Sequence, residues 1–287
     1  MGMLPAGIAA GAEPIVPPDT TVQRLAGGFK FTEGPAWDRK GSLYFSDIPQ
    51  QTILRWTEAE GAKPFKKLDG SCNGLFFDAA GDLLVCQPVG RAVRRITPNG
   101  EVSVVVDSYA GKKLNSPNDL WVAPNGGLYF TDPRYGPEND LEQDGFHVYY
   151  LPAGAKQATR ILDNLKKPNG IVGSTDGTKL YVTDPGAQTT YVYRIEPDGS
   201  LTNRQVAAAA GSDGLTLDEK GNLYITGKSI RIFGPDAQQV GEIPLPEVAA
   251  NLTFGGADRK TLFITARTSL YSIRLNVRGG GDPFAKD

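Results

Sequence analysis

The sequence of 287 residues has one histidine and two cysteines, and this scarcity limits the chemistry it can perform. With His147 as its sole imidazole, the chain cannot build a histidine dyad or a histidine zinc cluster. A Ser-His-Asp arrangement would depend wholly on this residue. We expect His147 to be a strand-borne surface or core residue. Cys72 and Cys86 are predicted to be free thiols, with a cross-strand disulfide as the alternative.

Other features are also missing from the chain. No apolar stretch approaches the roughly 20 residues of a transmembrane helix, so no membrane association is expected. The net charge is −2 and Lys and Arg form no stripe, which leaves no electrostatic footprint for nucleic acid. No apolar run at helical spacing exceeds about three turns, which favours a nearly all-β fold. The 35 glycines and 21 prolines are instead spread along the chain, as in turns between many short strands.

The two ends of the chain differ in composition from its centre. Residues 1–20 are predicted to be a flexible leader or the remnant of an export signal, residues 21–276 a single domain, and residues 277–287 a flexible tail. Ala10-Gly11-Ala12 has the small-x-small form of a signal cleavage site, although no basic region precedes it. An exported or periplasmic location is therefore slightly favoured over a cytoplasmic one.

A short apolar segment recurs six times along the chain, in variants such as "GSLYFSD" (41–47), "GGLYFTD" (126–132) and "TKLYVTD" (178–184). Its leucine stands at positions 43, 83, 128, 180, 223 and 262. The steps of 40, 45, 52, 43 and 39 residues are close to the four-strand period of a propeller blade. The sequence therefore predicts an all-β fold, a six-bladed β-propeller with four-stranded blades.

The sixth copy is followed by too little chain for a complete blade. After it, only "SLYSIRL" (269–275) precedes a glycine-rich tail. The N-terminal segment "TTVQRLAGGF" (20–29) is expected to supply the missing outer strand, which would close the ring and remove an open sheet edge. Trp37, Phe77 and Trp121 are predicted to pack between blades.

Each blade also offers a side-chain oxygen ten or eleven positions before its repeated leucine. These residues are Glu33, Asn73, Asn118, Asn169, Asp213 and Asn251. Because the innermost strand of each blade lines the central channel, equivalent positions at its start form a ring around the axis. Oxygen donors favour Ca²⁺, Mg²⁺ or Mn²⁺ over zinc or copper, and this set suits Ca²⁺ best. Glu33 is therefore predicted to be a metal ligand, whereas the alternative is that these residues only cap turns.

A second polar set stands at the end of the repeated segment in the first four blades. It consists of Asp47, Gln87, Asp132 and Asp184. Because this strand runs antiparallel to the innermost one, its end borders the same mouth of the channel. These side chains are predicted either to contact substrate hydroxyls or the groups around the metal, or simply to cap turns.

Several motifs carry a resemblance to a known family, among them "EGPAW", "CNGL", "NSPNDLWV", "LYFTDPRYG", "KPNGI", "LYVTDPGA" and "SDGLTLDEKGNLY". In their order and register they resemble the family of gluconolactonase, regucalcin (senescence marker protein) and luciferin-regenerating enzyme, from about residue 22 to 275. The bacterial gluconolactonase branch is the most similar. The resemblance implies a six-bladed propeller with a catalytic Ca²⁺, or a related cation such as Mg²⁺, Mn²⁺ or Zn²⁺, on its axis.

The resemblance also implies roles for individual residues. It assigns the metal to Glu33, Asn169 and Asp213, and it gives Asn118 to either the metal or the substrate. Asn73 and Asn251 are then expected to reach substrate or water without touching the metal.

One position departs from the family pattern. Regucalcin-like members carry an arginine two residues before the asparagine that matches Asn118, where this chain has Ser116. Arg134 and Tyr135 are expected to substitute for that arginine in substrate binding. Specificity is expected to depend on the loop of residues 136–146.

The implied reaction is hydrolysis of a sugar lactone, in which the cation polarises the carbonyl and water attacks it. The base must be a carboxylate, because histidine is absent from the ring and Tyr or Lys would be protonated near pH 7. We predict Asp213 as the base, with Asp184 second. Organophosphate hydrolysis and a non-catalytic calcium-binding propeller are the alternatives. The protein is expected to act on a small molecule as a monomer or weak dimer.

Overall fold

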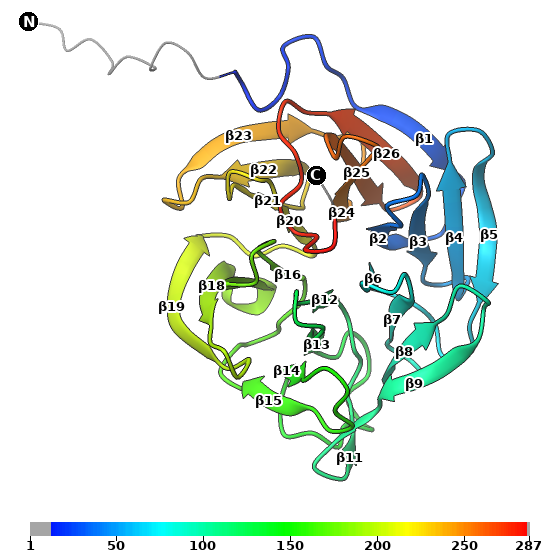
Figure 1. Cartoon of the computed structure of the whole chain (residues 1–287), viewed down its shortest axis with the longest axis vertical. Helices are drawn as coiled ribbons and strands as arrows, with labels where there is room; N and C mark the ends of the chain where they lie inside the picture. The colour runs from blue at the N-terminus through cyan, green and yellow to red at the C-terminus, as the bar shows by residue number, and fades with distance from the viewer. Residues whose placement is uncertain (1–12, 286–287) are drawn as a thin grey trace, which may run out of the picture.

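Six four-stranded antiparallel sheets surround a central channel in the computed structural model, which describes residues 13–285 (Figure 1). In each sheet the innermost strand lines the channel and the outermost faces outward. The prediction of an all-β, six-bladed propeller is confirmed. The predicted signal site at Ala10-Gly11-Ala12 lies outside the described residues.

The blades are numbered in chain order, and their strands are given from the channel outwards. Blade one contains β2 (Thr32–Trp37), β3 (Leu43–Asp47), β4 (Thr52–Thr57) and β5 (Gly61–Lys67). Blade two contains β6 (Leu75–Phe77), β7 (Leu83–Gln87), β8 (Ala92–Ile96) and β9 (Val102–Val106). Blade three contains β12 (Leu120–Val122), β13 (Leu128–Asp132), β14 (His147–Leu151) and β15 (Thr159–Leu162).

The remaining blades follow the same plan. Blade four contains β16 (Ile171–Gly173), β17 (Lys179–Asp184), β18 (Thr189–Ile195) and β19 (Leu201–Ala208). Blade five contains β20 (Leu215–Leu217), β21 (Leu223–Ile225), β22 (Ser229–Phe233) and β23 (Gln239–Pro244). Blade six contains β24 (Ala249–Gly255), β25 (Thr261–Ala266), β26 (Ser269–Arg274) and β1 (Gln23–Gly27). A small hairpin, β10 (Ser108–Tyr109) and β11 (Lys112–Lys113), and a 3-10 helix, η1 (Pro185–Ala187), lie between these strands.

The ring is closed by the N-terminal strand, as the sequence predicts. β1 pairs antiparallel with β26 and forms the outermost strand of blade six. The Nε of Arg24 in β1 donates a hydrogen bond to Ser269 Oγ at 3.1 Å. Before β1, Ile15 and Val16 pack against an apolar cluster shared by blades five and six, so this part of the predicted leader contacts the propeller. The pairing covers an edge of β26 that would otherwise be open to another chain.

Large side chains fill the spaces between neighbouring blades. Trp37 of blade one stacks on Phe263 of blade six, with ring centroids 5.4 Å apart. Trp121 of blade three is fully buried against Gly173 of blade four, where a Cβ atom would lie 2.3 Å from the indole. Phe77 of blade two meets a tyrosine of blade one edge to face. The prediction that these three residues pack between blades is confirmed.

Hydroxyl groups tie the inner strands of neighbouring blades together. Ser46 Oγ in blade one donates to the backbone oxygen of Asn73 in blade two at 2.7 Å. Thr131 Oγ1 in blade three donates to the backbone oxygen of Asn169 in blade four at 2.6 Å. Because these groups are buried, each bond satisfies a carbonyl that water cannot reach. The bonds therefore fix the relative heights of the strands that line the channel.

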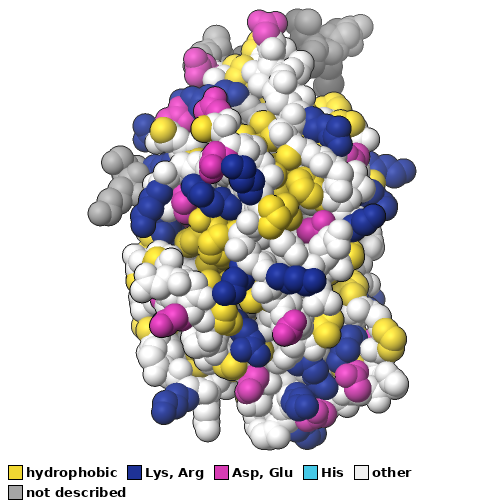
Figure 2. All heavy atoms as spheres, turned by 90° about the vertical axis from the view of Figure 1, so that its right-hand side faces the viewer, with side chains coloured by type: hydrophobic (Ala, Val, Ile, Leu, Met, Phe, Trp, Pro, Cys, Tyr) yellow, Lys and Arg dark blue, Asp and Glu magenta, His cyan; other side chains and the backbone are white. Residues whose placement is uncertain are grey.

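The rare residue types have structural positions. Cys72 and Cys86 are buried free thiols, as predicted. His147 is buried in β14, and its Nε2 lies 3.0 Å from Asp144 Oδ1, which agrees with the expected role as a core residue. On the side of the molecule that carries β5, Lys and Arg side chains are interspersed with Asp and Glu (Figure 2). Residues 13–285 include no helix with the length and apolarity needed to cross a bilayer.

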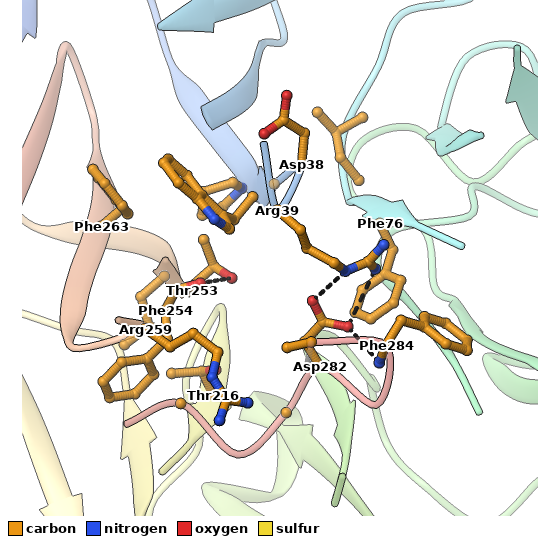
Figure 3. A pocket seen from close by; sticks show the side chains of 18 of the residues that line it. Asp38, Arg39, Phe76, Thr216, Thr253, Phe254, Arg259, Phe263, Asp282 and Phe284 are labelled. Atoms are coloured by element: carbon orange, nitrogen blue, oxygen red, sulfur yellow. Dashed lines mark hydrogen bonds and ion pairs between the residues drawn. The ribbon is translucent and has the colours of Figure 1, made fainter. Parts of the chain in front are cut away.

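The chain that follows β26 crosses one end of the channel. The inner strands begin at one face of the propeller, here called the ring face, and end at the opposite face, the turn face. At the turn face, Trp121 Nε1 donates to the Gly281 oxygen at 2.8 Å, and Arg39 binds the Asp282 carboxylate at 2.7 and 3.2 Å (Figure 3). Within the predicted tail, Gly281 and Asp282 therefore contact the propeller.

Candidate functional site

Five of the six predicted ring residues occupy equivalent positions. In blade one the repeated leucine, Leu43, pairs with Trp37, which stands four residues after Glu33. In blades two to five, the residue that pairs with the repeated leucine likewise stands four positions after the predicted ring residue, which is Asn73, Asn118, Asn169 or Asp213. Because their strands all begin at the ring face, these residues meet around the axis.

Asn251 does not share this position, so its predicted equivalence is wrong. In blade six the repeated Leu262 pairs with Phe254, and an offset of four leads to Ala250. The turn between the first two strands is longer here: eight positions separate the paired residues (262 − 254), against six in blade one (43 − 37). Counting eleven positions back from Leu262 therefore reaches Asn251, which stands one residue after the ring position at Ala250.

A second layer lies directly beneath the ring. The residue after each ring position is Gly34, Gly74, Asp119, Gly170, Gly214 or Asn251. Asn251 Nδ2 donates to Glu33 Oε2 at 3.0 Å, and its side chain also lowers the pKa of Asp119. A Cβ atom on Gly74 would lie 2.5 Å from Asp119 Oδ1, and one on Gly214 would lie 2.3 Å from Asn251 Oδ1. The glycines thus leave room for two side chains that meet from opposite blades.

Asp119 is a site residue that the sequence analysis missed. It is buried, and its carboxylate accepts hydrogen bonds from the backbone N–H groups of Leu120 at 2.9 Å and Ile171 at 3.3 Å. Together with Asn251 it lines the inner end of a cavity of about 1300 Å³ that runs to the turn face, where Arg39 and Asp282 stand (Figure 3). The available signal was its departure from the glycine that four other blades carry at this position.

Three predicted residues from consecutive blades are in direct contact at the ring face. Asn169 Nδ2 donates to Asp213 Oδ1 at 2.7 Å and to the Tyr135 hydroxyl at 2.8 Å. This places the tyrosine over the ring, as predicted, and it fixes the orientation of the Asp213 carboxylate.

The ring concentrates negative charge where water has little access. Burial raises the pKa of Glu33 well above its usual value, and the neighbouring charges of Asp213 and Asp119 raise it further. Burial likewise raises the pKa of Asp213 to about 6, against a hydrogen bond from Asn169 that lowers it. The pKa of Asp119 is also raised to about 6 by burial. A cation at the axis would offset this repulsion.

The donor chemistry of the ring fits a hard divalent cation. Within residues 13–285, no group of three or more His, Cys, Asp and Glu side chains is arranged to hold a metal. The predicted ligand set differs from such a group, because it combines two carboxylates, Glu33 and Asp213, with the amides of Asn118 and Asn169. Carboxylate and amide oxygens are ligands that Ca²⁺ accepts readily.

The predicted second polar set binds backbone amides. Asp184, the second candidate for the base, accepts hydrogen bonds from the N–H groups of Lys166 and Lys167 at 2.8 Å and of Ala187 at 3.3 Å. Both of its carboxylate oxygens are therefore engaged. Gln87 instead donates to two backbone carbonyls. These contacts favour the capping interpretation over direct contact with a substrate.

The mouth of the ring is lined differently from the family pattern. The hydroxyl of Ser116 donates to the backbone oxygen of Pro88 at 3.1 Å. Arg134 forms an ion pair with Asp140 of the adjacent loop at 3.0 Å. Lys167, which the sequence analysis did not single out, places its Nζ 4.6 Å from the ring centroid of Tyr135. Tyr135 and Lys167 therefore place polar groups beside the ring, where the family pattern has an arginine.

The fold and site define a six-bladed propeller with carboxylate and amide oxygens around its axis at one face. The sequence profile described as "SMP-30/Gluconolactonase/LRE-like region" matches residues 31–268, and the chain belongs to this family. The match confirms the resemblance seen in the sequence motifs.

Individual relatives agree with this membership. A gluconolactonase of Zymomonas mobilis is 31% identical over 295 residues, covering 91% of this chain and 83% of that protein. The structure of a gluconolactonase from Xanthomonas campestris has 33% identity and a TM-score of 0.84, with 95% and 99% of the two chains covered. Regucalcin from Agrobacterium tumefaciens, described as a calcium-binding protein, shares the fold at 18% identity and a TM-score of 0.78, with 96% and 100% covered.

The raised carboxyl pKa values predict how the metal-free protein responds to pH. A carboxyl with a higher pKa in the folded than in the unfolded state stabilises the fold at low pH, and this contribution is lost as pH rises through the folded pKa. For Asp119 and Asp213 the window runs from about pH 4 to about pH 6. We expect the thermal unfolding midpoint in chelator to rise by a few degrees between pH 7 and pH 5.

Differential scanning calorimetry of the chelator-treated protein would measure this effect. Asp213→Asn removes one of the titrating groups but keeps an oxygen of the same size, so it should show a weaker dependence on pH. A midpoint that falls steadily over the same range would contradict the assigned electrostatics.

Proposed function

We propose that this protein is a metal-dependent hydrolase of sugar lactones. The observation that carries the proposal is the contact of Asn169 with Asp213 in one axial ring with Glu33, at the ring face. Family relatives named gluconolactonase and lactonase support the substrate class. No observation favours an organophosphate over a lactone, or binding without turnover.

The ring residues would hold the cation. Glu33, Asn118, Asn169 and Asp213 provide two negative charges and two neutral oxygens, which suits Ca²⁺ or another divalent cation such as Mg²⁺, Mn²⁺ or Zn²⁺. When bound, the cation would supply Lewis-acid polarisation of the lactone carbonyl. The calcium-binding description of the Agrobacterium neighbour supports Ca²⁺ as the first cation to test.

Asp213 is the best placed side chain to take a proton from the attacking water. In the metal-free protein burial raises its pKa to about 6, and a bound cation would lower that pKa, so the carboxylate is ionised and able to accept a proton near neutral pH. The hydrogen bond from Asn169 holds one of its oxygens and so orients the other. Asp184 is a weaker candidate, since backbone amides occupy its carboxylate.

The remaining polar groups would bind the substrate. Tyr135 presents its hydroxyl beside the ring through the bond from Asn169, so it can contact a sugar hydroxyl. Asn73 and Asn118 stand in the same ring and can contact the lactone or water. Asn251 lies one layer deeper and holds Glu33 through a hydrogen bond. Its other expected role is contact with water. Arg134 stabilises the neighbouring loop through Asp140.

The proposed activity is tested with a panel of lactones. Glucono-δ-lactone, galactono- and xylono-lactones and aromatic lactones would be assayed with and without chelator, beside a fluorophosphate and an aryl phosphate. We expect turnover of at least one sugar lactone, loss of activity in chelator, and recovery with added Ca²⁺. Faster turnover of the phosphorus compounds, or thermal stabilisation by Ca²⁺ with no turnover at all, would contradict the proposal.

The role of Asp213 is separable from metal binding. Asp213→Asn keeps an oxygen of the same size but loses the basic group, and the loss of a general base typically costs about 10² to 10⁴ in rate. This variant should therefore stay slow at saturating metal. Asn118→Ala should instead regain much of its rate when metal and substrate are both raised, because its loss acts through binding.

Rates measured across a metal titration would distinguish these roles. Near wild-type turnover of Asp213→Asn at high metal would mean that Asp213 is only a ligand and that the base lies elsewhere.

A further inference from the structure

Three buried aspartates make the same contacts in three blades. Asp47, Asp132 and Asp184 each end the second strand of their blade, β3, β13 and β17. They are 3%, 0% and 1% exposed, respectively. In each blade the carboxylate accepts hydrogen bonds from the backbone N–H groups of the residues three and two positions before the ring residue. We call this arrangement the aspartate clamp.

The distances are similar in the three copies. In the clamp before Glu33, the donors are Lys30 N at 3.1 Å and Phe31 N at 3.2 Å. In the clamp before Asn118, they are Asn115 N at 2.8 Å and Ser116 N at 2.7 Å. In the clamp before Asn169, they are Lys166 N and Lys167 N, both at 2.8 Å. In every copy the two successive N–H groups bind the two different oxygens of one carboxylate.

The clamp is absent from the other three blades. Blade two has Gln87 at this position, and its amide donates to the carbonyls of Asp69 and Ser71 at 3.0 Å. Blades five and six have Gly227 and Ala266, which carry no acceptor in their side chains. The three clamped loops therefore lead to Glu33, Asn118 and Asn169, which are three of the four residues assigned above to the metal. The unclamped Asn73 is assigned to substrate or water.

A carboxylate suits this task better than any neutral side chain. Its two oxygens accept two N–H groups at once. An amide has one acceptor oxygen, so its NH₂ group would face one of the backbone donors. Because only one residue separates the clamped pair from the ring residue, displacement of the loop also moves the ring oxygen.

We propose that Asp47, Asp132 and Asp184 are positioning residues that hold Glu33, Asn118 and Asn169 at the geometry needed by a divalent cation. The inference rests on the metal-dependent function proposed above. Groups that orient metal ligands without touching the metal typically change its affinity by about 10- to 100-fold when they are removed. Asp184 then acts through Asn169 and is not the base.

The test compares three clamp variants with a matched control. Asp47→Asn, Asp132→Asn and Asp184→Asn would be titrated with Ca²⁺ by isothermal calorimetry, which needs no substrate. The control is Asp218→Asn at the turn face. Asp218 is 2% exposed; its Oδ1 accepts the backbone N–H groups of Lys220 and Asn222, both at 2.9 Å, and its Oδ2 accepts from the Asn222 side chain and the Tyr224 hydroxyl. It anchors a turn that leads to no ring residue.

We expect each clamp variant that folds to bind Ca²⁺ about 10- to 100-fold more weakly, and the control to bind it like the parent protein. Thermal unfolding would be measured for all four, since each should lose some stability. At saturating Ca²⁺ the kcat of Asp184→Asn should approach that of the parent protein. Because the three clamps are independent, the comparison does not depend on any one variant folding.

Three results would overturn the inference. One is a parent-like Ca²⁺ affinity in the clamp variants. Another is an equal loss of affinity in Asp218→Asn, which would reduce the clamps to general stabilisers. A parent protein that binds no Ca²⁺, Mg²⁺ or Mn²⁺ would remove the metal centre itself, and the clamp with it. If the parent binds no cation yet turns over a lactone in chelator, the hydrolase assignment holds and only the metal centre fails.

Discussion

Repulsion among carboxylates that converge on the propeller axis is the constraint around which the ring face is organised. Burial and mutual charge raise the pKa of Glu33, and burial raises that of Asp119 and Asp213. Ionised groups so close together are costly unless hydrogen bonds or a cation compensate for them. The structure supplies part of this compensation through the amides of Asn169 and Asn251. The remainder is what a divalent cation would provide.

The propeller meets this constraint by fixing the backbone beneath each side chain. Hydroxyls such as Thr131 Oγ1 bind the carbonyls of the next blade, and the aspartate clamps hold the loops that enter the ring. β1 closes the sheet of blade six, so that the six inner strands form a complete ring. Side chains held on such a frame lose little entropy when a cation or substrate binds, which is why the geometry can be prepared in advance.

Most of the fold could be predicted from the repeated segment and its spacing. The spacing of the repeated leucines predicted six blades, and the shortage of chain after the sixth copy predicted closure by β1. The ring was also visible, because one polar position per blade recurs at a fixed distance. Asn251 was misplaced because two extra residues lie in the turn of its blade, and spacing alone cannot locate an insertion. Asp119 was missed because its partner, Asn251, is distant in sequence. The contacts of Asp282 with Arg39 likewise depend on packing that composition does not reveal.

The central claim is that the ring binds a divalent cation on the axis. The most direct measurement is anomalous diffraction from crystals grown with Mn²⁺ as a stand-in for Ca²⁺. The account predicts one strong anomalous peak at the ring face, within coordination distance of oxygens from Glu33, Asn169 and Asp213. It also predicts that Asn73 lies outside that distance. A peak bound elsewhere on the surface, or no peak at the axis at saturating Mn²⁺, would contradict the claim.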